Sequence, residues 1–177
     1  MPPNGTPPPS QILAATADNC TLVAVIGSAT FKLAPAFKQA TQAARLAGSA
    51  LIVVDMEACP AMDSTFMGAL ASLGFLLRKS DATRLVLINL LPSAAAMLRG
   101  LGVDRILKVY PAGGLPAGLG DLAALGRSLR PVETAASEHE LAALMYDAHE
   151  TLTRVDPENL QRFKDVLAFL REDLARF

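Results

Sequence analysis

The residues that could carry chemistry lie in residues 51–70, LIVVDMEACPAMDSTFMGAL. A continuous apolar run ends at Asp55, and Asp63, Ser64 and Thr65 precede a pattern of helical spacing. Asp63 is a typical N-cap residue, because its carboxylate can accept hydrogen bonds from the free N–H groups of the first helical turn. The Ser64 hydroxyl is therefore expected in or beside that turn. Two interpretations follow from the residues alone: a simple helix cap, or a phosphorylation site.

A phosphate on Ser64 would be well placed electrostatically. It would meet unpaired backbone N–H groups at the positive end of the helix dipole. It would also add roughly −1.5 to −2 charges at pH 7 directly beside Asp63, enough to change a docking surface.

The same serine lacks the sequence surroundings of a hydrolase nucleophile. Met62 and Phe66 occupy the positions at which a G-x-S-x-G elbow has glycine. The two histidines, His139 and His149, come far later in the chain. We expect them to be solvated helix residues rather than a general base. The sequence thus predicts a protein that is not an enzyme and binds no cofactor.

The composition excludes several other classes. A net charge of −1 argues against a nucleic-acid partner, which needs a basic face. Two His and two Cys are too few for a typical zinc site, so no metal is predicted. Cys20 and Cys59 are expected to be buried or part-buried thiols of a reducing compartment. No signal peptide is recognisable, and the longest uncharged apolar run falls short of the roughly 20 residues that span a bilayer. We therefore predict a cytoplasmic protein without a membrane segment.

Strand-like and helix-like segments alternate along residues 11–110. This alternation predicts crossover connections and a parallel or mixed sheet. The expected strands are residues 12–17, 21–26, 50–55, 84–90 and 106–110. The expected helices are residues 35–47, 64–79 and 92–101. Continuous apolar strands such as residues 50–55 are typical of a sheet covered on both faces.

The ends of the chain differ from this region. Residues 1–10 are rich in Pro and Gly and are predicted to form a flexible tail. Residues 111–133 are a Gly/Pro-rich connector with one short helical piece at 121–129. Residues 134–177 are predicted to form a helical hairpin, because two apolar stripes flank Asp156 and Pro157. The first stripe is Leu141, Leu144, Met145, Ala148 and Leu152; the second includes Leu160, Phe163, Leu167 and Leu170.

The hairpin must be covered by another surface, since isolated short helices are marginal in water. It carries five Lys or Arg against nine Asp or Glu, whereas the residues before it carry a net positive charge. This charge difference favours packing of the hairpin on its own core, with a homodimer as the alternative.

Residues 51–70 also resemble the signature of STAS domains, which occur in sulfate transporters and anti-sigma-factor antagonists. In that family an apolar strand ends in Asp, and an Asp-Ser pair eight positions later begins the helix with the regulated serine. Asp55, Asp63 and Ser64 reproduce this spacing, and Gly68 and Leu70 match the small and apolar positions that follow. The order of elements over residues 11–110 matches as well. The resemblance implies a STAS-like mixed α/β sheet of four to five strands with covering helices, followed here by the hairpin.

Two departures from the family pattern concern the surface around Ser64. Phe66 stands where the family usually has Gly, which places a bulky apolar group on the expected docking surface. The loop at residues 27–31 lacks the acidic residue that is frequent there.

The resemblance implies an anti-sigma-factor antagonist with Ser64 as phosphoacceptor. Asp63, Thr65, Phe66 and Met67 would contact the partner. The unphosphorylated protein would bind an anti-sigma factor that is also a serine kinase, and a PP2C-type phosphatase would reset the switch. Two alternatives remain: an accessory subunit of a lipid-transport system without phosphorylation, and a small-ligand sensor with an apolar pocket beneath the helices.

Overall fold

The computed structural model describes residues 9–79 and 82–176. Most of the predicted tail, residues 1–8, lies outside them. The elements follow in the order β1 (Gln11–Ala17), β2 (Cys20–Ile26), α1 (Ala34–Leu46), β3 (Leu51–Asp55), α2 (Ser64–Arg78), β4 (Arg84–Leu90), α3 (Pro92–Gly100), the 3₁₀ turn η1 (Val103–Arg105), β5 (Lys108–Pro111), α4 (Leu122–Arg127), β6 (Arg130–Pro131), α5 (Glu138–Val155) and α6 (Asn159–Leu174).

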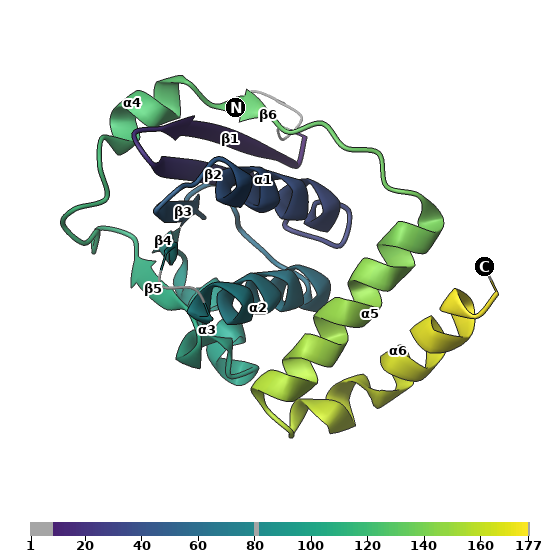
Figure 1. The fold of residues 1–177 in the computed structure, drawn as a ribbon. Helices are drawn as coiled ribbons and strands as arrows, with labels where there is room; N and C mark the ends of the chain where they lie inside the picture. Colours follow the sequence, from purple (N-terminus) through teal and green to yellow (C-terminus); the bar gives the residue numbers. More distant parts are fainter. Residues whose placement is uncertain (1–8, 80–81, 177) are drawn as a thin grey trace, which may run out of the picture.

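A mixed sheet of six strands, in the order β5-β4-β3-β2-β1-β6, forms the centre of the fold (Figure 1). β2 to β5 are parallel, and β1 pairs antiparallel with both β2 and β6. The predicted fold class is confirmed, but the number of strands exceeds the four to five expected. The additional strand, β6, has only two residues, Arg130 and Pro131, which is too short for any periodic pattern in the sequence.

Each face of the sheet packs into its own core, as the continuous apolar strands predicted. Ile52 and Val54 of β3 enter the larger core beneath α1 and α2. Leu51 and Val53 enter a smaller core on the opposite face. There Leu125 of α4 joins them, so the Gly/Pro-rich segment also covers part of the sheet.

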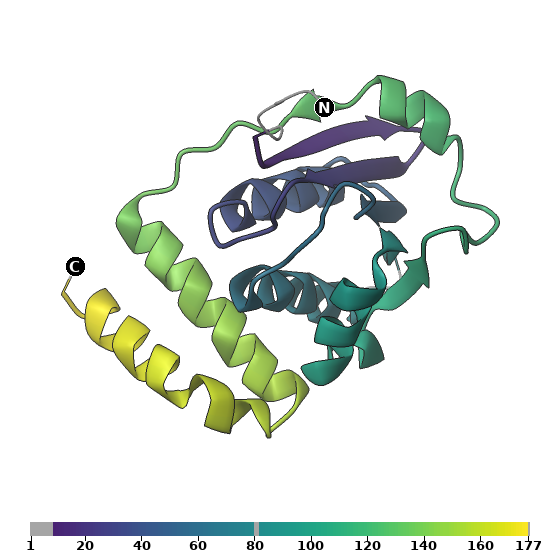
Figure 2. The same cartoon turned by 180° about the vertical axis from the view of Figure 1, so that it is seen from behind.

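The C-terminal hairpin adds two further helical layers beyond α2. Figures 1 and 2 both show α5 running across α2, with α6 on the outer side of α5. Leu152 of α5 is fully buried in the larger core, so the hairpin packs on its own domain, as favoured from the charges. Within the single chain, Leu160 of the predicted stripe is not covered and is 55% exposed. α6 packs mainly on α5, with hydrogen bonds from its first turn to the carbonyl oxygens of Gly100 and Leu101, and one side of α6 faces solvent.

Both cysteines are buried, which confirms the expectation from the sequence. Burial raises the pKa of the Cys59 thiol, whose Sγ lies 3.2 Å from the Ala61 carbonyl oxygen. Burial also raises the pKa of Cys20. Since the thiolate is the reactive form, we expect iodoacetamide at pH 8 to alkylate both thiols at least about tenfold more slowly in the folded protein than in urea. Mass spectrometry of timed samples measures both rates, and equal rates in the two conditions would contradict the prediction.

Candidate functional site

Ser64 is the first residue of α2, and Asp63 is its N-cap. The Asp63 Oδ1 accepts a hydrogen bond from the Phe66 N–H at 2.8 Å, as the sequence predicted. Its Oδ2 accepts a second one from the Phe31 N–H at 2.7 Å. One carboxylate therefore both caps α2 and holds the loop after β2 against the start of the helix. Both carboxylate oxygens of Asp63 accept hydrogen bonds from the backbone of the same chain, so Asp63 stabilises the position of Ser64.

The Ser64 hydroxyl contacts a residue that lies 85 positions later in the chain. Its Oγ is 2.9 Å from Nε2 of His149 on α5. The His149 Nδ1 lies 2.8 Å from the Met145 carbonyl oxygen, which can only accept a hydrogen bond. When the imidazole is neutral, its proton is therefore on Nδ1 and the Ser64 hydroxyl donates to Nε2. The His149 ring is 3% exposed and meets Phe163 of α6 edge-on, with centroids 5.0 Å apart.

The expectation that His149 is a solvated residue remote from Ser64 is wrong. The helical periodicity contained a signal for its burial. His149 follows Met145 by four residues and precedes Leu152 by three, so it lies on the apolar side of α5. His139, by contrast, is exposed, as expected.

Small residues let α5 approach α2 closely beside this hydrogen bond. A Cβ placed at Gly68 would lie only 2.4 Å from the Ala148 carbonyl oxygen. One turn further along, the Ser72 and Thr151 hydroxyls are 2.9 Å apart. The helix that begins at Ser64 is therefore covered by α5 along its first two to three turns.

The turn between α5 and α6 is held against the segment that follows α3. Asn159 is 1% exposed, and its Nδ2 donates to the carbonyl oxygens of Leu101 and Leu152, each at 2.9 Å. Arg105 forms an ion pair with Asp156. These contacts fix the position of the turn and thereby the path of α5 over Ser64.

The residues predicted to contact the partner differ in their exposure to solvent. Ser64 and Asp63 are partly exposed, whereas Thr65 and Met67 are 3% and 4% exposed. Phe66 is fully buried and packs on the Phe37 ring at a centroid distance of 5.1 Å. The expected surface position of Phe66 is wrong, because its side chain points from α2 toward α1 and fills the core.

Ser64 and His149 lie at the distance of a nucleophile and its base. The group that orients His149 is the neutral Met145 carbonyl rather than a carboxylate. Neither residue lines the cavity between α1, α2 and α5 or the two hollows beside β5. In this arrangement the pair acts as a contact between two helices. Across residues 9–79 and 82–176, no group of three or more His, Cys, Asp or Glu is placed to hold a metal ion.

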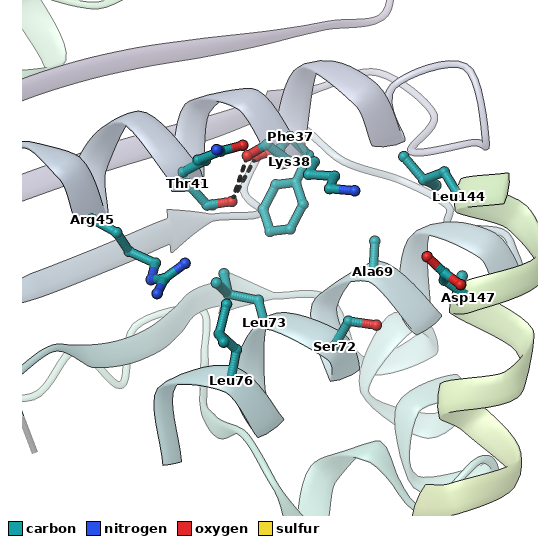
Figure 3. A pocket seen from close by; sticks show the side chains of 12 residues that line it. Phe37, Lys38, Thr41, Arg45, Ala69, Ser72, Leu73, Leu76, Leu144 and Asp147 are labelled. Atoms are coloured by element: carbon teal, nitrogen blue, oxygen red, sulfur yellow. Dashed lines mark hydrogen bonds between the residues drawn. The ribbon is translucent and has the colours of Figure 1, made fainter. Parts of the chain in front are cut away.

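A cavity of about 200 Å³ lies between α1, α2 and α5 (Figure 3). Phe37 and Thr41 of α1 and Leu73 of α2 are buried side chains that line it. Lys38 and Arg45 of α1 stand at its rim, where both are exposed. The cavity is thus apolar at its floor and cationic at its edge.

A family model described as "Mlab, STAS domain" matches residues 12–109, which is more than half of the chain. The protein therefore belongs to the STAS-domain family. Among curated proteins, no sequence matches significantly. In the described residues, no helix is both long and apolar enough to cross a membrane.

Two solved structures share the fold at low sequence identity. One is an anti-sigma factor antagonist from Mycobacterium paratuberculosis, with a TM-score of 0.51, 22% identity, and coverage of 68% of this chain and 97% of the other. The second, from Thermotoga maritima, is a protein assigned as an anti-sigma factor antagonist. It has a TM-score of 0.51 and 17% identity, and the match covers 56% of this chain and 86% of the other.

Proposed function

We propose that this protein is a cytoplasmic anti-sigma-factor antagonist of a bacterial partner-switching pathway, with Ser64 as its phosphoacceptor. Its partners are an anti-sigma factor that is also a serine kinase and a PP2C-type phosphatase. The observation that carries the proposal is the position of Ser64 as the first residue of α2, directly after the N-cap Asp63, in a STAS domain. Two solved structures with the same fold bear the description of anti-sigma factor antagonists, which supports the assignment.

The chemistry of the site fits a phosphate-controlled switch. A phosphoryl group on Ser64 would meet the free N–H groups of the first turn of α2 and the positive end of its dipole. Its added charge beside Asp63 would oppose docking of an apolar or acidic partner. Thr65 is 3% exposed, so Ser64 is the more accessible hydroxyl of the pair.

The hydroxyl is engaged before any partner arrives. It lies 2.9 Å from Nε2 of His149 on α5, so transfer of a phosphoryl group to Ser64 requires this hydrogen bond to break. The proposed switch therefore includes the loss of this contact with the hairpin as its first step.

We expect mass spectrometry of the protein purified from its source cells to show phosphate on Ser64. Ser64→Ala should lose this phosphate but still co-purify with the anti-sigma factor. Ser64→Asp should weaken that binding by about tenfold or more, since charge is added beside Asp63. The matched control is Ser93→Asp, which adds the same charge at an exposed position on α3.

The same purification distinguishes the phosphorylation switch from a second candidate function, an accessory subunit. The matching family model bears the name Mlab, which favours an accessory subunit of a lipid-transport system. Co-purification with a transporter ATPase, together with an unmodified Ser64, would support that function and overturn the phosphorylation switch.

A further inference from the structure

We propose that the cavity between α1, α2 and α5 binds a small amphipathic anion, an alkyl chain with a single carboxylate or phosphate head group. This site is separate from Ser64 and does not depend on the function proposed above. Its floor is made by Phe37 and Leu73, which are 1% and 6% exposed, with Ala69 beside them (Figure 3).

The size of the space argues for a ligand that is small and apolar over most of its length. Apolar walls without a partner lose dispersion contacts, and an apolar cavity of roughly 150 Å³ is enough to bind benzene. The cavity here has about 200 Å³. Sites for drug-sized ligands have roughly 300–1,000 Å³, so a single short alkyl chain fits better than a larger ring system.

The charges at the rim select the sign of the head group. Lys38 and Arg45 are seven residues apart on α1, hence on the same side of the helix, and Asp147 of α5 is the acidic residue among those that line the cavity. Among the described residues, Arg105 and Asp156 form an ion pair, whereas Lys38 and Arg45 form none. Both side chains at the rim can therefore bind an anion. Figure 3 shows the Arg45 guanidinium directed toward Leu73 and Leu76, at the end of the cavity remote from Asp147. A guanidinium there can bind a carboxylate or phosphate with two parallel hydrogen bonds.

The ligand would also report on the position of the hairpin. Leu144, Asp147 and Ala148 of α5 form one wall of the cavity, and the next residue is His149. The complete cavity exists only when α5 is seated on α2. A ligand that binds this state alone stabilises it by mass action, so occupancy of the cavity should hold α5 in place.

Isothermal titration calorimetry of the full chain with decanoate, decyl phosphate, decanol and decyltrimethylammonium tests the assignment. We expect both anions to bind about tenfold more tightly than decanol, and the cation to bind most weakly. Arg45→Gln should bring decanoate to the level of decanol, whereas Arg127→Gln, at an exposed position on α4, should change nothing. Preference for one anion identifies the head group, and equal affinity for all four compounds overturns the proposal.

A variant that fills the cavity provides the second test. Ala69→Leu places a larger side chain in the space and should abolish binding while the protein stays folded. Ala43→Leu adds the same atoms on an exposed part of α1 and should bind normally. Decanoate should also slow amide hydrogen exchange in α5 by at least about threefold. Undiminished binding by Ala69→Leu would show that the anion binds elsewhere, and unchanged exchange in α5 would overturn the link to the hairpin.

Discussion

Replacing Gly68 by alanine should loosen α5 from α2 and increase amide hydrogen exchange throughout α5 by about tenfold or more. The added Cβ would lie 2.4 Å from the Ala148 carbonyl oxygen and 2.7 Å from the Ala148 Cβ. The atoms in the way belong to or adjoin the backbone of α5, so a change of rotamer cannot relieve the overlap. Overpacking of this kind costs about 1–3 kcal/mol, more than the ~1 kcal/mol that alanine gains over glycine in a helix.

Gly126→Ala is the matched control for this variant. A Cβ at Gly126, on α4, would meet no atom within 4 Å, so this substitution should be neutral or slightly stabilising. If Ser64 is the phosphoacceptor, Gly68→Ala should also be phosphorylated faster, since the cover over Ser64 is loosened. The two readouts are independent. Exchange in α5 that does not change on substitution would contradict the close approach of Ala148 to Gly68, whereas faster exchange without phosphorylation would contradict only the switch.

Leu152→Ala should lower the free energy of unfolding by about 2–5 kcal/mol, the usual cost of removing a buried leucine side chain. Leu152 is fully buried in the larger core, although it belongs to the hairpin. For a chain of this length, the loss corresponds to a decrease in Tm of about 5–15 °C. Thermal unfolding followed by circular dichroism measures it.

Leu160→Ala removes the same atoms from the outer helix of the hairpin and is the control. Leu160 is 55% exposed, so its loss should change the stability by no more than about 0.5 kcal/mol. Similar small effects of both substitutions would mean that the hairpin is detached from the domain. Similar large effects would mean that Leu160 is also covered, as in the homodimer that the sequence left as an alternative.

These two experiments address the feature that distinguishes this chain from a bare STAS domain. The family model matches residues 12–109, and the hairpin beyond them lies on α2, the helix that begins with Ser64. The extension therefore covers part of the surface at which the proposed partner would dock. Its hydrogen bond to the Ser64 hydroxyl couples the two parts at the residue proposed to be modified.

The local elements and the position of Ser64 at the start of α2 could be predicted from the sequence. The apolar run that ends in β3, the Asp63 cap and the stripes of α5 are patterns over a few residues, and such patterns depend on backbone hydrogen bonds and on the period of the side chains. They therefore predicted the strands, the helices and the start of α2 to within a few residues. The connector was predicted less well, because β6 has two residues and owes its structure to pairing with β1.

The residue that contacts the Ser64 hydroxyl could not be predicted in this way, because it depends on how distant helices pack. The contact with His149 depends on where α5 crosses α2, and that crossing is set by the small residues Gly68 and Ala148 and by the anchored turn at Asn159. Burial of Phe66 likewise depends on the distance between α1 and α2. Periodicity shows which side of a helix is apolar, but it does not specify the neighbour that covers it or the register of the contact. Close packing of side chains from distant segments determines both.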